Sequence, residues 1–188
     1  MTAPPTPSDA EIIELLRQPA RREEGFRYLL RKYSERLYAH VRRMVGNHSD
    51  TDDVLQNTFL KVHRHVDNFE GRSQLYTWLY RIASNEALTL LQKRKRLTVS
   101  SLDDPDAPVG QQPVAAPYQE SEEVQRRLFT AIGTLPEKQR LVFNLRYFDE
   151  LSYQEMSDLL GTSVGGLKAS FHHAVKKVEQ HLRDTVTG

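Results

Sequence analysis

Apolar residues recur every three or four positions along most of this chain. That spacing is typical of α-helices with one buried face. Nothing in residues 8–96 alternates with the period of two that a half-buried strand would show. Interruptions by polar turns divide the pattern into four segments before residue 97 and four after residue 119. The sequence therefore predicts an all-α protein.

The N-terminal segments have recognisable beginnings and ends. Their expected helices are one from Ser8 or Asp9 to near Pro19, one from Arg22 to about Val45, one starting from the possible caps at 47–50, and one from Ser73 to Arg96. Gly46 follows the second helix, where a residue that tolerates left-handed backbone is common. These four helices would form one bundle.

The C-terminal segments are shorter and more closely spaced. Their expected helices are one from Ser121 to about Ile132, one with Pro136 at its first position and ending at Phe148, one over Tyr153–Leu160, and one from Val164 to about Leu182. Ser152 and Glu155 have the spacing of a capping box. Two helices joined by a short turn at Gly161 are typical of a helix-turn-helix.

A change of composition separates these two groups. Residues 97–119 contain four prolines, one glycine and no Lys or Arg, a composition that cannot fill a core. We expect a disordered tail over 1–7, a helical domain over 8–96, a flexible linker over 97–119 and a second helical domain over 120–188.

Charge and composition narrow the function. Residues 21–96 hold 16 Lys/Arg against 9 Asp/Glu, which favours a polyanion as partner for the first domain. The 188 residues include no cysteine, no apolar run long enough to span a bilayer and no signal peptide, so we expect a cytoplasmic protein without membrane insertion. No catalytic motif or metal-ligand spacing is present; we expect a protein that is not an enzyme and needs no metal or cofactor.

Two stretches carry candidate chemistry for nucleic acids. Residues 68–96 contain the only tryptophan, Trp78, and end in four consecutive cations. This stretch has two interpretations. In one, the tryptophan is a core residue and the cations form a solvated tail; in the other, the stretch is a surface that stacks on bases and binds phosphates. The expected last helix presents Lys168, His172 and Lys176 on its solvent side, as a helix that reads the major groove would.

At this point the residues resemble a known family. The blocks DTDDVLQNTFLKVHRHVDNF and GRSQLYTWLYRIASN are similar to region two of bacterial RNA polymerase sigma factors of the extracytoplasmic-function group. The block LPEKQRLVFNLRYFDELSYQEMSDLLGTSVGGLKASFHHAV is similar to region four. The resemblance implies a transcription initiation factor that binds core RNA polymerase, through the β′ clamp helices and the β flap, and melts promoter DNA. An anti-sigma protein is a further partner that the family suggests.

The resemblance also assigns roles to residues. The polymerase-binding positions are Asp52, Asp53, Gln56, Asn57 and Leu60. The positions for the minus-ten element are Asn68, Phe69, Gly71, Ser73, Tyr76, Arg81, Asn85, Lys93, Arg94, Lys95 and Arg96. The positions for the minus-thirty-five element are Ser163, Gly165, Lys168, Ser170, His172, His173 and Lys176. Trp78 lies on the apolar stripe and is expected to be scaffold.

The recognition turn departs from the family pattern. Family members commonly have Gly-Thr-Val-Lys/Arg-Ser-Arg where this chain has Gly165-Gly166-Leu167-Lys168-Ala169-Ser170, and His173 replaces an Arg. Fewer cations predict weaker phosphate anchoring. A close approach of DNA backbone would explain the two glycines, and so would flexibility without function.

Two other classes of function remain open on the residues alone. One is a DNA-binding regulator that uses only the C-terminal helix-turn-helix, with residues 8–96 as a partner-binding bundle. The other is a protein-binding helical scaffold, which predicts no salt-dependent affinity for DNA. Only a sigma factor makes core polymerase start at a defined promoter without a resident sigma factor.

Overall fold

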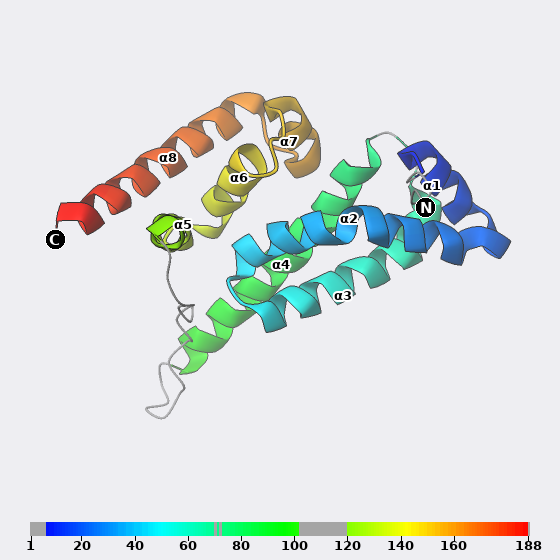
Figure 1. Cartoon of the computed structure of the whole chain (residues 1–188), viewed down its shortest axis with the longest axis horizontal. Coiled ribbons are helices and arrows are strands. Elements are labelled where there is room, and N and C mark those ends of the chain that lie inside the picture. Colours follow the sequence, from blue (N-terminus) through cyan, green and yellow to red (C-terminus); the bar gives the residue numbers. More distant parts are fainter. Residues whose placement is uncertain (1–6, 70, 72, 102–119, 188) are drawn as a thin grey trace.

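The computed structural model describes residues 7–69, 71, 73–101 and 120–187. Within them the chain forms helices and no strand, as predicted. In order, the elements are α1 Asp9–Arg17, a 3-10 turn Pro19–Arg21, α2 Arg22–Val45, α3 His48–His65, a 3-10 turn Val66–Asn68, α4 Leu75–Ser101, α5 Glu120–Gly133, α6 Glu137–Tyr147, α7 Tyr153–Leu160 and α8 Val164–Thr187 (Figure 1).

Local capping explains where several helices begin and end. At α7 the Ser152 hydroxyl accepts the backbone N–H of Glu155, and the Glu155 carboxylate accepts the backbone N–H of Ser152 at 2.7 Å, which confirms the predicted capping box. Helix α1 begins with the same arrangement at Ser8. Gly46 ends α2 in the left-handed region at φ 91°, as the sequence predicts.

Helices α1 to α4 form the N-terminal unit. Helix α1 packs on α2, while α2, α3 and α4 lie side by side (Figure 1). The close contact of α1 and α2 depends on Gly25, because a Cβ at that position would lie 2.8 Å from the Leu16 backbone nitrogen and 2.9 Å from the Leu15 Cβ. Helices α5 to α8 form the C-terminal unit, with a small core of their own under α5 and α8 that includes Ile132, Leu135 and Phe143.

Helix α4 departs from the prediction at both ends. It begins at Leu75, and the Gln74 carbonyl accepts the first helical hydrogen bond, from the Trp78 N–H. Gln74 therefore takes the N-cap position that we expected for Ser73. At the other end the helix continues to Ser101, so residues 97–101 of the expected linker are helical. The rest of that linker, and residues 1–6 of the expected tail, lie outside the described residues.

Two smaller differences concern the C-terminal unit. Pro136 is the N-cap of α6, with ψ 143°, and is not its first helical residue. Helix α8 continues to Thr187, beyond the expected end at Leu182. None of the helices in the described ranges is both long enough and apolar enough to cross a membrane.

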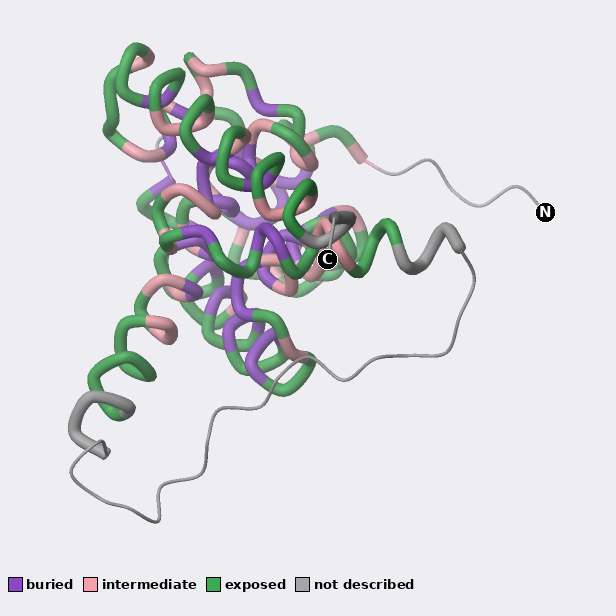
Figure 2. The backbone as a smooth tube through the Cα atoms, turned by 90° about the vertical axis from the view of Figure 1, so that its left-hand side faces the viewer, coloured by how far each residue is buried: buried purple, intermediate pink, exposed green. Residues whose placement is uncertain are grey.

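The two units are in contact. Leu141, Leu145 and Met156 belong to the same buried cluster as the core residues of α2 and α4. Helix α6 packs on α2, and α7 packs on the first half of α4 (Figure 1). The buried segments of both units gather where these helices meet (Figure 2). Helices that are far apart in the sequence, α2 and α6 as well as α4 and α7, therefore lie next to each other in space.

Candidate nucleic-acid interface

One exposed face of α3 carries the predicted polymerase-binding set. All five members, Asp52, Asp53, Gln56, Asn57 and Leu60, are exposed. The opposite side of the helix is buried through Val54, Thr58 and Val62. Within the described ranges, no hydrogen bond or ion pair involves the side chains of the four polar members of the set. The α3 face is thus a row of available polar groups beside Leu60, an apolar side chain that is 48% exposed.

The acidic start of α3 contains one carboxylate with a structural role. Asp50 is buried, and it accepts hydrogen bonds from the Asn47 amide and from Arg94, each at 2.6 Å. The Asn47 side chain also accepts the Asp50 backbone N–H and caps the helix. Arg94 was predicted to hold a DNA phosphate, whereas in this conformation its guanidinium ties α4 to the start of α3.

The predicted minus-ten set divides into covered and exposed residues. Phe69 is only 4% exposed and its ring lies 5.1 Å from that of Trp78, centroid to centroid. The Arg17 guanidinium donates a hydrogen bond of 3.0 Å to the Phe69 carbonyl. Phe69 therefore packs as scaffold here, which differs from the DNA contact that we expected. Trp78 packs against the core as predicted.

Other members of the minus-ten set are accessible. The exposed ones are Asn68, Gly71, Arg81, Asn85, Lys93, Arg94, Lys95 and Arg96, and Ser73 is half-buried. Gly71 has φ 73°, a left-handed conformation that favours glycine in the loop before α4. These residues lie in the loop before α4 and at exposed positions along α4, and together they make up an exposed polar track.

Two members of the set, Tyr76 and Arg81, instead contact the C-terminal unit. The Tyr76 hydroxyl donates a hydrogen bond to Glu155, and partial burial together with this bond raises the pKa of Tyr76. The same bond is the largest reason why the pKa of Glu155 lies below its usual value. Arg81 donates to the Leu159 carbonyl at 3.0 Å and also to the Asp158 carbonyl. The sequence predicts both residues as DNA contacts, whereas in this conformation their side chains bind groups of the C-terminal unit.

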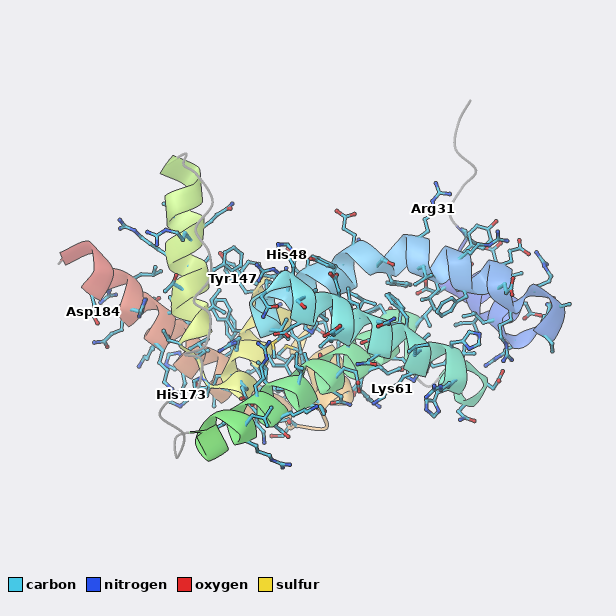
Figure 3. The ribbon with its side chains drawn as sticks, turned by 90° about the horizontal axis from the view of Figure 1, so that it is seen from below. Arg31, His48, Lys61, Tyr147, His173 and Asp184 are labelled. Carbon is cyan, nitrogen blue, oxygen red and sulfur yellow. The ribbon has the colours of Figure 1, made fainter. Side chains whose placement is uncertain are left out.

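Helix α8 presents the predicted minus-thirty-five set. Ser163 caps the helix, since its hydroxyl accepts the Gly166 backbone N–H at 3.2 Å. The exposed members are Ser163, Gly165, Lys168, His172, His173 and Lys176, and Ser170 is half-buried. His173 and Asp184 both lie on α8, and Asp184 is near the far end of that helix (Figure 3). The structure thus brings the set together on one accessible helix.

The structure contains a buried polar cluster that was not predicted from the sequence. Asp149, in the turn after α6, accepts hydrogen bonds from His40 at 2.7 Å and from Arg43 at 2.5 Å. The other ring nitrogen of His40 lies 3.0 Å from the Ser84 hydroxyl. His40 is fully buried, and its position three residues after Leu37 on the apolar side of α2 was the available signal. Nothing in the sequence around Asp149, the partner in the C-terminal unit, indicated this contact.

The described residues contain no group of three or more His, Asp or Glu side chains arranged to hold a metal ion. The exposed side chains at these surfaces are suited to binding: cations and amide groups can bind phosphates and bases, and a polar helix face can bind a protein. The exposed polar track and the exposed helix α8 belong to different units.

Comparisons with known proteins agree with this arrangement. Residues 29–97 match the family model of sigma-70 region 2, and residues 125–178 match that of sigma-70 region 4. The ECF RNA polymerase sigma-E factor of Salmonella typhimurium strain LT2 is 31% identical over 174 residues, covering 87% of this chain and 90% of that protein. The corresponding sigma-E factor of Haemophilus influenzae is 28% identical over 184 residues, covering 94% and 96%.

Solved structures share the fold. CnrH in complex with the cytosolic domain of CnrY matches with a TM-score of 0.70 and 20% identity, covering 94% of this chain and 97% of that one. The sigma factor RpoE of Bartonella quintana, in complex with the anti-sigma factor NepR, matches with a TM-score of 0.67 and 23% identity, covering 84% and 96%. The chain therefore belongs to the ECF group of RNA polymerase sigma factors, which direct RNA polymerase to promoters to start transcription.

Proposed function

We propose that this sigma factor binds its partners through three separate surfaces. The exposed face of α3, with Asp52, Asp53, Gln56, Asn57 and Leu60, docks on the clamp helices of the polymerase β′ subunit. The observation that carries this assignment is that the four polar side chains are exposed and lack partners in the described part of the chain. A protein surface kept open in this way retains its hydrogen-bonding groups for a partner.

The second surface captures one promoter strand at the minus-ten element. The loop before α4 and the side of α4 with Tyr76, Arg81 and Asn85 would hold an extruded base, and the cations from Lys93 to Arg96 would hold phosphates beside it. Extruding a base costs a few kcal/mol, roughly, and stacking with a fixed pocket offsets that energy. Strand capture then melts the promoter without ATP.

The third surface is helix α8 in the major groove of the minus-thirty-five element. Its N-terminal residues would meet base edges, and Lys168 and Lys176 would meet phosphates. The C-terminal unit also contacts the β flap of the polymerase in this proposal. The protein would act in the cytoplasm, where polymerase and promoters are found.

An inhibitory protein partner completes the proposal. CnrH and the Bartonella quintana RpoE were each solved in complex with another protein, an anti-sigma factor in the second case. Support within this chain comes from Phe129 and Tyr147, aromatic side chains that are 46% and 55% exposed on the C-terminal unit. We infer that an anti-sigma protein binds this chain. Copurification with the endogenous tagged chain, followed by a release assay with core polymerase, would identify it.

A pair of substitutions separates the protein-binding and DNA-binding surfaces. The double variant Gln56→Ala/Asn57→Ala should weaken binding to a purified β′ clamp-helix fragment by about tenfold, as truncation of central interface residues does. It should leave duplex DNA binding unchanged. His65→Ala, an exposed change on the same helix outside the set, is the matched control.

The reciprocal variant is Lys168→Ala. It should weaken duplex DNA binding without altering clamp-helix binding. It should also reduce, by about one, the slope of the logarithm of the DNA-binding constant against the logarithm of salt concentration, as expected for a lost phosphate contact. Loss of both activities in either variant, or unchanged clamp-helix affinity in the double variant, would contradict the assignment of surfaces.

A further inference from the structure

Helix α1 is fixed on α2 by apolar and polar contacts. Ile12 and Leu16 of α1 are fully buried in the same core cluster as the apolar side of α2. At the start of α1, the Asp9 carboxylate accepts hydrogen bonds from the Lys32 ammonium and from the Tyr33 hydroxyl, each at 2.7 Å. These contacts hold α1 along its length, so the helix can support other parts of the unit.

Two arginines near the junction of α1 and α2 reach the 3-10 turn that precedes α4. Arg22 donates its Nε to the Leu16 carbonyl at 3.1 Å and a terminal nitrogen to the Asp67 carboxylate at 2.5 Å. Arg17, an exposed residue, donates at 3.0 Å to the Phe69 carbonyl. A guanidinium is a planar fork that can hold two acceptors in a fixed geometry. The helix pair is thus tied to the turn at two points.

The two points lie on either side of Asn68. Val66 and Phe69 are 1% and 4% exposed, and the Phe69 ring packs on Trp78. Helix α1 also packs on this turn. Asn68, in contrast, is exposed, and its neighbour Asp67 is the residue that Arg22 holds. The direction in which the Asn68 side chain is presented therefore depends on neighbours that are anchored to α1 and α2.

The arginines are better suited to holding the turn than to binding DNA themselves. The positive charge of Arg22 is paired with the Asp67 carboxylate, which would repel a phosphate. Arg17 and Arg22 also precede residues 29–97, the range that matches sigma-70 region 2, so the match gives them no role. With side chains 26% and 55% exposed, the pair of Arg22 and Asp67 adds little to the stability of the fold.

We propose that Arg17 and Arg22 are positioning residues for strand capture. They fix the Phe69 carbonyl and the Asp67 carboxylate, and thereby hold Asn68 in the orientation that meets an extruded base of the minus-ten element. The inference rests on the proposed function, because it concerns the geometry of the minus-ten surface. It extends the functional part of the chain to α1 and the first turn of α2.

The test uses the full chain assembled with core RNA polymerase. Its probe is a fluorescent single-stranded oligonucleotide, selected from random sequence by the wild-type holoenzyme. Asp67→Ala should weaken binding about fivefold, because apparent affinity scales with the fraction of molecules that hold the binding geometry. Without a positioning role, loss of this carboxylate would instead strengthen binding, since it removes a repulsion. Glu23→Ala, which removes an exposed carboxylate next to Arg22, is the matched control and should not weaken binding.

The arginine variants test the same contacts from the other side. Arg22→Met should match Asp67→Ala, and the double variant should lose no more than either single one, because all three lack the same ion pair. Arg17→Met should also weaken binding about fivefold while leaving the salt dependence of binding unchanged, since no phosphate contact is lost. Trp78 is the only tryptophan and packs on Phe69, so its fluorescence reports on the turn without DNA or polymerase. Acrylamide should quench it more in Arg17→Met than in the wild type.

Tighter or unchanged oligonucleotide binding by Asp67→Ala would overturn the inference. So would weaker binding by Arg17→Met with unchanged quenching of Trp78 and a reduced salt dependence, because the arginine would then contact DNA directly. A folding defect would lower binding to a β′ clamp-helix fragment as well, which should stay at the wild-type level in every variant. A failure of the proposed function has a different signature: Asn68→Ala would then bind the oligonucleotide as tightly as the wild type.

Discussion

Gly165 offers a test of how α8 meets DNA. It lies in the first turn of the helix, it is exposed, and a Cβ built on it meets no atom within 4 Å. Replacing glycine by alanine in a helix contributes up to about 1 kcal/mol, and we expect roughly half of that in a first turn. Gly165→Ala should therefore make the free protein slightly more stable.

The same methyl group should weaken DNA binding. If a phosphate approaches the backbone of this turn, the added Cβ holds it away from the N–H groups at the helix start. A hydrogen bond to a charged group contributes about 1.5 to 3 kcal/mol, so we expect a loss of roughly tenfold or more in affinity for the minus-thirty-five duplex. Stability and binding would change in opposite directions, which a folding defect does not produce.

The assay combines thermal unfolding with fluorescence anisotropy on a duplex selected from random sequence by the wild-type protein. Gly133→Ala at the end of α5 is the matched control, because its added Cβ also meets nothing within 4 Å and it lies outside the helix-turn-helix. Unchanged affinity in Gly165→Ala would refute the close approach of DNA and leave flexibility as the reason for the glycine. Reduced stability would refute the structural reasoning.

Three further predictions concern the N-terminal unit. Gly25→Ala should destabilise the protein by about 1 to 2 kcal/mol in denaturant unfolding, because overpacking against α1 outweighs the gain in helix propensity; a neutral result would contradict the contact. Arg94→Ala should lower the free energy of unfolding by about 1 kcal/mol, because it leaves buried Asp50 without its ion pair; the value is small because the guanidinium is half-exposed. Lys95→Ala should leave the free energy of unfolding unchanged. Equal stabilities of the Arg94→Ala and wild-type proteins would contradict a structural role for Arg94. Asn85→Ala should impair promoter opening, followed with a fluorescent base, more than core binding, and equal loss of both would indicate a folding defect.

Features with a local cause were predictable from the sequence. The capping box of Ser152 and Glu155 and the left-handed Gly46 depend on residues within a few positions of each other, and both are confirmed. The period of the apolar stripe also placed Leu79 in the core and Trp78 against it. Helix ends without a strong signal were less certain: Gln74, which has no special capping propensity, took the position expected for Ser73.

Contacts between distant residues had no such signal. Arg81 meets α7 across 77 and 78 positions of sequence, and His40 meets Asp149 across 109. An arginine off the apolar stripe has the same pattern whether it faces DNA, solvent or another helix. The sequence therefore predicts candidate surfaces, and only the three-dimensional arrangement reveals that Tyr76 and Arg81 contact another part of the chain.

Run-off transcription with purified core RNA polymerase tests the central claim most directly. The templates are a genomic promoter library from the source organism, and the chain is the added specificity factor. The account predicts new transcripts that start at defined positions and that require this chain but no other sigma factor. Absence of specific initiation, or initiation only when a resident sigma factor is supplied, would contradict it.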